Sequence, residues 1–226
     1  MAGLVLDIAP GWKTYWRNPG AAGIPPQFDW TSSRNLGSAE VFWPRPKFFE
    51  SFGLTTIGYS DRVVLPVRLV PQVAGAPIEL GLNLSLGVCR DICVLEETSL
   101  TLRLEPDAQG DGSALIAAAM TAVPRPGAEQ GMTAVTCQIT GTGPKRSFDA
   151  KLDFGREISG ATVVLEGPET AWFDQTVTEA RDGSLHVSSR LSLFDGSAWV
   201  SRSQVRMTVL AENMAADIQG CAAPAG

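Results

Sequence analysis

The sequence predicts an all-β protein made of two β-sandwich domains. Residues 78–86 alternate between aliphatic side chains at even positions and polar residues or glycine at odd positions, as a half-buried strand does. Short runs of this kind recur through both halves, with turn residues about every ten residues. Only residues 112–124 are typical of a helix. We therefore expect a first sandwich over residues 1–110, a helix and linker over 111–131, and a second sandwich over 132–226.

Composition limits the classes of partner. The 226 residues are 44% hydrophobic and 19% charged, which is typical of a soluble globular protein. The formal net charge is −6 and no cluster of lysine and arginine occurs, so we expect neither nucleic acid nor an anionic membrane as a partner. No apolar run reaches the roughly 18 residues of a membrane span, and we expect no direct membrane insertion.

The chain starts as if inside a domain. Residues 1–10 lack the basic segment and long apolar core of a secretory signal, and Leu4, Leu6 and Ile8 already alternate as a strand does. Four cysteines that divide into two pairs favour an oxidising compartment. A first domain truncated at its N-terminus would reconcile these observations, and we expect the full-length form to be secreted.

The first half contains two segments rich in aromatic residues. Residues 11–26 are expected to run into a loop because proline and glycine crowd their second part, and their Trp and Tyr side chains favour core packing over a ligand platform. Residues 47–53 are predicted to be a loop whose phenylalanines plug the core or cover a reactive site. Short strands are expected at residues 28–30, 41–44 and 63–70. Pro66 places the last of these at a sheet edge or a bulge.

Cys89 and Cys93 lie where the strand over residues 78–86 turns into a second alternating run, residues 100–104. In one extended strand their Cα atoms would be roughly 13 Å apart, too far for a disulfide. If residues 90–92 form a three-residue hairpin loop, the Cα atoms face each other at roughly 4.5–5.5 Å and a bridge is possible. The spacing alone leaves a reactive pair and a structural clip equally open.

Cys137 and Cys221 have a different spacing. In the chain-entropy model, closing their loop of about 85 residues stabilises the fold by roughly 4.5 kcal/mol, whereas the short loop between Cys89 and Cys93 contributes on the order of 2 kcal/mol. We therefore interpret Cys137 and Cys221 as a structural disulfide of the second domain. The short pair is the better candidate for chemistry.

The helix and the strands of the second half have clear start, stop and turn signals in the sequence. Ser113 is expected to cap the helix, alanines fill it and Pro124 ends it, before a linker from Gly127 to Gly131. Asp182-Gly183 between two alternating runs is a strong hairpin signal. Other strands are expected at residues 148–154, 161–165 and 205–209.

Few residues outside the cysteines suggest chemistry. His186 is the only histidine and no cysteine lies near it in the sequence, which argues against a zinc site or a histidine-dependent catalytic centre. No glycine-rich phosphate loop occurs, and we expect no metal and no cofactor. Beside a thiol, Arg90 would favour the thiolate, whereas Glu96 and Glu97 would disfavour it.

An ordered set of motifs in the first half carries a family likeness. The motifs are Gly11-Trp-Lys-Thr-Tyr-Trp-Arg-Asn-Pro-Gly20, Trp43-Pro-Arg-Pro46, Phe52-Gly53, Ile57-Gly-Tyr59, Val64-Leu-Pro-Val67 and Val88-Cys-Arg-Asp-Ile-Cys93. Together they resemble the N-terminal periplasmic domain of the DsbD/ScsB thiol:disulfide interchange proteins, over roughly residues 3–105. The second half looks like the additional immunoglobulin-like domain that follows in ScsB-type proteins.

The resemblance implies an immunoglobulin-like sandwich whose pair, Cys89 and Cys93, cycles between dithiol and disulfide. In that family a membrane-embedded or thioredoxin-like partner reduces the pair, which then reduces periplasmic client proteins. Phe49 and Phe52 would belong to the region that shields the pair, and Tyr59 would lie near the strand beneath. The surroundings expected for the redox pair are Arg90, Asp91, Glu96, Phe49, Phe52 and Tyr59.

Some features depart from the family pattern. Leu95 stands where a proline often follows the second cysteine, and Ala21 stands where an acidic residue often follows the first glycine of its segment. The membrane and thioredoxin-like domains of the family are absent from this sequence, so the electrons are expected to come from another polypeptide.

The leading hypothesis is therefore a periplasmic thiol:disulfide exchange protein that works through Cys89 and Cys93. Two alternatives stay open. A Cu(I)-binding copper-tolerance protein would use the same two thiolates as soft ligands. A non-catalytic adaptor would hold both disulfides as inert structural bridges.

Overall fold

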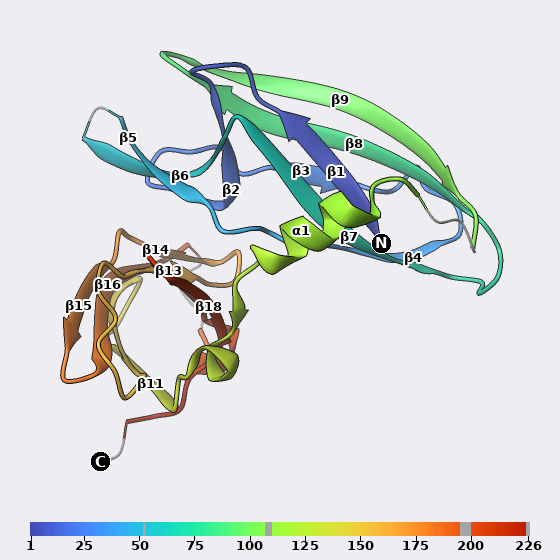
Figure 1. Ribbon diagram of the computed structural model, residues 1–226. Coiled ribbons are helices and arrows are strands. Elements are labelled where there is room, and N and C mark those ends of the chain that lie inside the picture. The colour runs from blue at the N-terminus through green and yellow to red at the C-terminus, as the bar shows by residue number, and fades with distance from the viewer. Residues whose placement is uncertain (52, 107–109, 195–199, 225–226) are drawn as a thin grey trace. The chain divides into compact units, whose positions relative to one another are not determined.

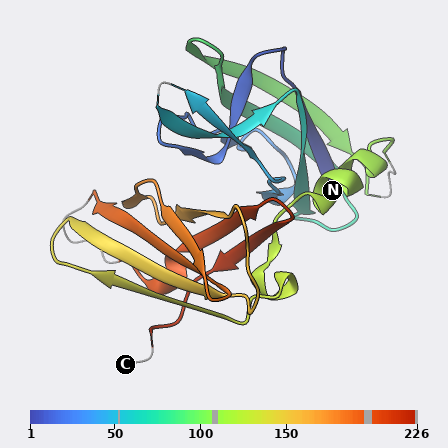
Figure 2. The same cartoon turned by 60° about the vertical axis from the view of Figure 1, so that its left-hand side comes forward.

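Strands dominate the structure. The computed structural model describes residues 1–51, 53–106, 110–194 and 200–224, and the chain divides into two compact units, residues 1–123 and 124–226 (Figures 1 and 2). The predicted all-β fold class with two domains is confirmed. Within the described ranges, no helix is long and apolar enough to cross a membrane.

Two antiparallel sheets form the first unit. The smaller sheet has the order β1 (Ala2–Asp7), β7 (Arg62–Pro71) and β4 (Leu36–Val41). The larger sheet has the order β3 (Gln27–Asp29), β8 (Ile78–Cys89), β2 (Lys13–Gly20), β6 (Leu54–Ser60) and β5 (Lys47–Ser51), and β9 (Cys93–Leu104) pairs with β8. In Figure 1, β8 and β9 are the long green hairpin at the rim of this unit.

The alternation of β8 determines how the two sheets pack. Leu82, Leu84 and Leu86 are buried, and Leu4 and Leu6 of β1 pack against them. Successive side chains of a strand point to opposite faces, so the even positions of β8 face the interior of the sandwich and the odd positions face outward. Cys89 is an odd position, and it therefore lies on the outer face of the larger sheet.

β2 forms from the aromatic segment, and β5 forms where the sequence suggested a loop. Tyr15 and Trp16 of β2 are buried, because β2 lies between β6 and β8 and pairs with both. β5 pairs with β6 along its whole length, from Lys47 opposite Gly58 onward. The expected core packing of the aromatic segment is thus confirmed for Tyr15 and Trp16. The loop prediction was wrong for β5, because its aromatic side chains lie at cross-strand packing positions opposite β6.

Pro66 does not place its strand at an edge. β7 is the central strand of the smaller sheet, with Gly3 of β1 opposite Pro66. On its other side the register with β4 ends at Val41 opposite Val67, and Phe42 N–H donates to the Pro66 carbonyl. The N–H and C=O of one residue point to the same side of a strand. The backbone N–H that Pro66 lacks would therefore point toward Phe42, just beyond the end of β4, where the β4–β7 ladder does not need it. The prediction of an edge or bulge was wrong for this reason.

The helix α1 (Ser113–Thr121) belongs to the first unit. Its N-cap is Gly112, without a side-chain hydrogen bond, so the prediction that Ser113 caps it was wrong. Ser113 is already the first helical residue. The side chain of Ile116 lies against Gly3 of β1, where an added Cβ would come within 3.0 Å of it.

Two further sheets face each other in the second unit. One has the order β10 (Arg125–Pro126), β18 (Met214–Gln219), β17 (Arg206–Ala211) and β13 (Thr162–Glu166). The other has the order β11 (Ala134–Thr140), β12 (Lys145–Asp153), β16 (Ser184–Leu193) and β14 (Ala171–Phe173), and β15 (Val177–Arg181) also pairs with β16. The described part of this unit also contains the short 3-10 helices η1 (Gly127–Gln130), where the sequence suggested a linker, and η2 (Arg202–Gln204).

A continuous apolar core joins these two sheets. Phe148 and Leu152 of β12 belong to the same buried cluster as Val163 of β13 and Met207 of β17, and each of the four is 0% exposed. The predicted hairpin turn at Asp182-Gly183 is confirmed, with positive φ angles of 51° and 74° joining β15 to β16.

The tail of the second unit is more ordered than the sequence indicated. β18 precedes Cys221 and was not predicted, and a disulfide joins Cys221 to Cys137 of β11 across 84 residues of sequence. The two sulfur-bearing residues have Cα atoms 5.7 Å apart, so the bridge ties the end of the described chain to an edge of the second sheet.

Candidate functional site

A disulfide closes the hairpin between β8 and β9. Cys89 and Cys93 are bonded, with Cα atoms 4.1 Å apart, and they form the last register pair of the two strands. Residues 90–92 make the loop, in which Arg90 N–H donates to the carbonyl of Ile92. The three-residue loop that would permit a bridge is present, and the Cα separation is shorter than the expected value of roughly 4.5–5.5 Å.

The two sulfur-bearing residues differ in accessibility. Cys89 is 2% exposed, whereas Cys93 is exposed, as are its neighbours in β9. Disulfide exchange begins when a thiolate reaches one sulfur in line with the bond to the other. Of the two residues, Cys93 is therefore the more accessible to a thiolate of another protein.

Tyr15 connects β2 to both sulfurs. Its hydroxyl donates to Cys89 Sγ at 2.9 Å and lies 3.4 Å from Cys93 Sγ. Lys13 is the register partner of Cys89, so Tyr15, two residues further along β2, projects from the same outer face. Burial raises the pKa of the Tyr15 phenol, which keeps it a neutral hydrogen-bond donor at physiological pH.

Gly87 makes room for this tyrosine. A Cβ on Gly87 would lie 3.1 Å from two atoms of the Tyr15 ring and 2.7 Å from the side chain of Ile24. A larger residue would therefore push the phenol away from Cys89. Tyr15 was not predicted as a site residue. Its contact with the sulfurs depends on the register between β2 and β8, which no local sequence pattern shows.

Lys13 lies beside the tyrosine and is itself buried. Its ammonium donates to Thr56 Oγ1 at 2.9 Å and sits 5.2 Å from the centroid of the Phe49 ring. Thr56 and Phe49 are register partners in β6 and β5. Burial lowers the pKa of Lys13 because desolvation disfavours the charged ammonium. Lys13 thus ties the β5–β6 hairpin to the strand that borders the disulfide.

Arg90 and Asp91 occupy the tip of the cysteine hairpin. Arg90 Nε donates to Asp91 Oδ2 at 2.9 Å, and both side chains are more than half exposed. The Arg90 guanidinium also lies 5.4 Å from the ring centroid of Trp12. These contacts hold the loop against Trp12, just before β2, and pair one charge of each sign at the tip of the hairpin.

Other residues expected around the pair have different positions. Tyr59 is the register partner of Thr14, so it faces the sandwich interior, where its hydroxyl donates to the carbonyl of Pro44 at 2.7 Å. Burial raises the pKa of Tyr59. Glu96 lies on β9 opposite Leu86, three residues beyond Cys93, and is exposed. Phe52 falls outside the described residues.

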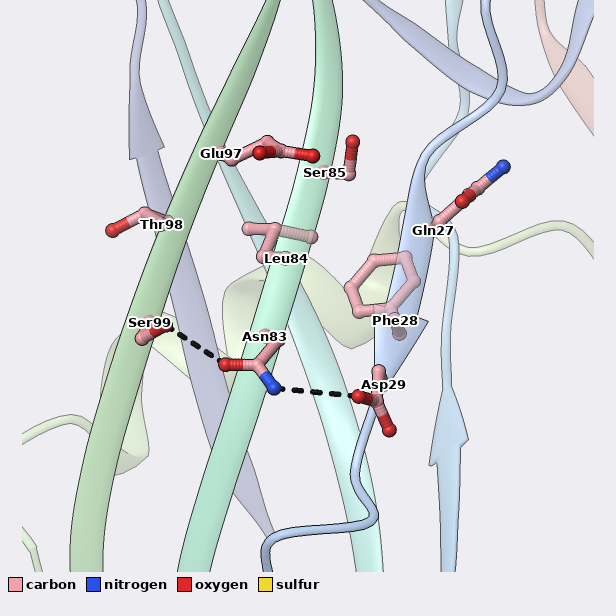
Figure 3. A pocket seen from close by; sticks show the side chains of 9 residues that line it. All are labelled: Gln27, Phe28, Asp29, Asn83, Leu84, Ser85, Glu97, Thr98 and Ser99. Atoms are coloured by element: carbon pink, nitrogen blue, oxygen red, sulfur yellow. Dashed lines mark hydrogen bonds between the residues drawn. The ribbon is translucent and has the colours of Figure 1, made fainter.

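A shallow hollow follows the same strands away from the disulfide. It has a volume of about 490 Å³ and lies over β3, β8 and β9, with Phe28, Asp29 and Glu97 among its lining residues (Figure 3). Asn83 bridges its floor, donating to Asp29 at 3.3 Å and accepting from Ser99 at 2.8 Å. Within the described residues, no three His, Cys, Asp or Glu side chains gather into a group that could hold a metal.

Comparisons with known proteins give the following matches. Residues 1–105 match the model of the family described as "Thiol:disulfide interchange protein DsbD, N-terminal". The crystal structure of the N-terminal periplasmic domain of ScsB from Proteus mirabilis has a similar fold, with a TM-score of 0.76 and 23% sequence identity over 98% of this chain and 86% of that one. No curated protein sequence matches the chain.

Proposed function

Because residues 1–105 form a DsbD N-terminal domain, we propose that this protein exchanges disulfides with other proteins through Cys89 and Cys93. The family match supports a role in thiol:disulfide interchange, and the bonded pair supplies the chemical group for it. We propose that the pair takes electrons from a thioredoxin-like or membrane-embedded donor and passes them to client proteins.

The observation that carries this proposal is the asymmetry of the pair. Cys93 is exposed, whereas Cys89 is buried and accepts a hydrogen bond from Tyr15 at 2.9 Å. A hydrogen bond to a thiolate stabilises it more than one to a neutral sulfur, so the Tyr15 hydroxyl favours Cys89 as the leaving group. A structural clip has no need of such an arrangement.

The reductive half of the cycle follows from this geometry. A donor thiolate attacks Cys93 Sγ, a donor–Cys93 disulfide forms, and the Cys89–Cys93 bond breaks with Cys89 leaving as a thiolate. The second thiolate of the donor then attacks the donor sulfur of the mixed disulfide, which forms the donor's internal disulfide and releases Cys93 as a thiolate. The donor is oxidised to a disulfide, and the pair gains two electrons and, once both thiolates are protonated, two protons.

The oxidative half reverses the roles. The Cys93 thiolate attacks a client disulfide and one client sulfur leaves as a thiolate. Cys89 then loses its proton and attacks Cys93 Sγ, which closes the bridge and releases the reduced client. Lys13 and Phe49 border the outer face on which these steps take place.

The compartment is part of the same proposal. The similar ScsB domain is periplasmic, and a disulfide-bonded pair persists in an oxidising compartment. We place this protein in the periplasm, where disulfide-bonded clients occur.

Differential alkylation with mass spectrometry across glutathione redox buffers tests the function. We expect Cys89–Cys93 to open at potentials of roughly −120 to −270 mV, the range of exchange proteins, while Cys137–Cys221 stays closed and serves as an internal control. If both bridges resist reduction down to about −300 mV, the proposal is wrong and the bridges are structural.

A further inference from the structure

β9 has an unusual position for so long a strand. It runs for 12 residues and pairs with β8 alone among the described strands. Every residue from Cys93 to Arg103 is exposed. Its outer edge therefore presents a row of backbone N–H and C=O groups that are open to pairing with another strand.

One face of β9 continues the apolar interior of the sandwich. Leu100 and Leu102 lie opposite Leu82 and Leu80 of β8, yet they are 41% and 51% exposed. The other face carries Glu97, Ser99, Thr101 and Arg103. Figure 3 shows Glu97 and Ser99 on β9 beside the hollow. The leucine face also carries Thr98 and Glu96 toward the start of the strand. An added strand would thus meet mainly leucines on one face around residues 100–104 and polar groups on the other.

We propose that β9 is a dimerisation edge at which it pairs antiparallel with β9 of a second copy of this chain, in a register centred on Leu100. A two-fold axis perpendicular to the sheet then relates the copies, which keeps the apolar face with the apolar face. In this register Leu100 meets its own copy, Thr98 lies opposite Leu102, and Ser99 lies opposite Thr101. The pairing covers residues 96–104 of both copies.

Charge complementarity selects the second copy and this register. Centred on Leu100, Glu97 of each copy lies directly opposite Arg103 of the other, so two opposite-charge pairs form by symmetry. A shift of the centre to Thr101 sets Glu97 against Glu105, and a shift to Ser99 sets Leu95 against Arg103. The strand is therefore complementary to itself in the register centred on Leu100 and not in these neighbouring ones.

The two charged residues are suited to this contact. Glu97 is exposed and has no ion pair within the described part of the chain. Arg103 contacts Glu79 at 3.3 Å and Glu105 at 2.7 Å in its own chain. A guanidinium has five N–H donors, so Arg103 can keep these contacts and also donate to Glu97 of the second copy.

The proposed dimer leaves the redox pairs accessible. Cys93 lies three residues before the paired stretch begins, at the far end of β9 from Leu104. In the antiparallel register the two copies of Cys93 are separated by 14 residue positions, roughly 48 Å along the strands. Each pair therefore meets its donor or client independently.

Sedimentation equilibrium over a concentration series up to about 1 mM tests the dimer. We expect the protein to dimerise, and each of the variants Glu97→Arg and Arg103→Glu to weaken dimerisation about tenfold, because each sets like charges opposite one another twice. An equimolar mixture of the two variants restores opposite-charge pairs at both positions. We expect the mixture to form a heterodimer within about twofold of the original affinity.

A matched control is Glu96→Arg, which makes the same change in net charge on the same strand. Glu96 lies opposite Leu104 of the second copy, so we expect little effect on dimerisation. Recovery in the mixture also shows that both single variants are folded. A protein that stays monomeric at 1 mM, or a dimer indifferent to both charge reversals, overturns the proposal.

Discussion

The hydroxyl of Tyr15 lies 2.9 Å from the Sγ of Cys89, where it donates a hydrogen bond from β2 to the buried sulfur of the pair. The two residues are 74 positions apart in the sequence. The contact exists because Lys13 is the register partner of Cys89 and because Gly87 leaves space for the phenol ring. It gives the two sulfurs different surroundings, because the same hydroxyl lies 3.4 Å from the Sγ of Cys93.

Tyr15→Phe should slow reduction of the pair. Without the hydroxyl the Cys89 thiolate loses a charge-assisted hydrogen bond, which is worth about 1.5–3 kcal/mol in typical cases. We expect the pKa of the Cys89 thiol in the reduced protein to rise by about one unit or more and the rate of reduction by dithiothreitol to fall at least about tenfold. Stopped-flow reduction and the pH dependence of alkylation measure both quantities.

Tyr59→Phe is the control for that variant. It removes a buried phenol hydroxyl from the same domain, but this hydroxyl donates to the Pro44 carbonyl in the sandwich interior. We expect a loss of about 1 kcal/mol in the free energy of unfolding and no change in the reduction rate. Equal effects of the two variants on the rate would contradict the role assigned to Tyr15.

Single-cysteine variants should separate the two sulfurs. In the reduced state, Cys89→Ser leaves the exposed Cys93, and Cys93→Ser leaves Cys89, which is 2% exposed. We expect Cys93 to react with iodoacetamide at least about tenfold faster at neutral pH, since a buried thiol is poorly reactive. The difference should vanish in denaturant, and faster labelling of Cys89 in the native protein would reverse the proposed order of attack.

Lys13→Met should change how stability depends on pH. Burial lowers the pKa of Lys13, so between its folded pKa and its unfolded value of about 10.4 the unfolded chain binds more protons. The free energy of unfolding of the original protein therefore increases as the pH rises through this window. Below the window, the full cost of burying the charged Lys13 ammonium lowers the stability.

Urea unfolding from pH 7 to pH 10.5 checks this sign. We expect the difference in free energy of unfolding, original protein minus Lys13→Met, to increase with pH. The raised pKa of Tyr59 acts in the opposite direction, because a phenol buried as the neutral form loses stability at alkaline pH, but it is common to both proteins and cancels. The exposed Lys47, paired with Asp61, provides the control variant Lys47→Met. A flat difference for Lys13→Met would contradict the prediction.

Removal of the long disulfide should affect stability and leave exchange intact. With Cys137→Ala and Cys221→Ala together, the unfolded chain regains the entropy of a loop that spans 84 positions, about 4.5 kcal/mol in the chain-entropy model. We expect calorimetry to show a lower melting temperature for the second unit. The rate at which Cys89–Cys93 is reduced should stay within about twofold, and a large loss of exchange would mean that the two bridges are coupled.

The sequence by itself determined the strands whose pattern is local. β8 and the hairpin at Asp182-Gly183 formed as predicted, because period-2 alternation and positive-φ turn residues act over a few neighbours. The same local geometry fixed the three-residue loop, since only a turn brings Cys89 and Cys93 within bonding distance. The family likeness in the first half was also readable from ordered motifs and is confirmed.

The tertiary structure decided what depends on register. Pro66 can lie in a central strand because β4 ends at Val41, one residue before the position that would pair with the backbone N–H that proline lacks. No local sequence pattern shows where a neighbouring strand ends. Likewise Tyr59, in a family motif, faces the interior, whereas Tyr15 reaches the sulfurs, because cross-strand pairing assigns each to a face. Sequence patterns specify which residues alternate, but pairing between distant strands specifies which of them meet.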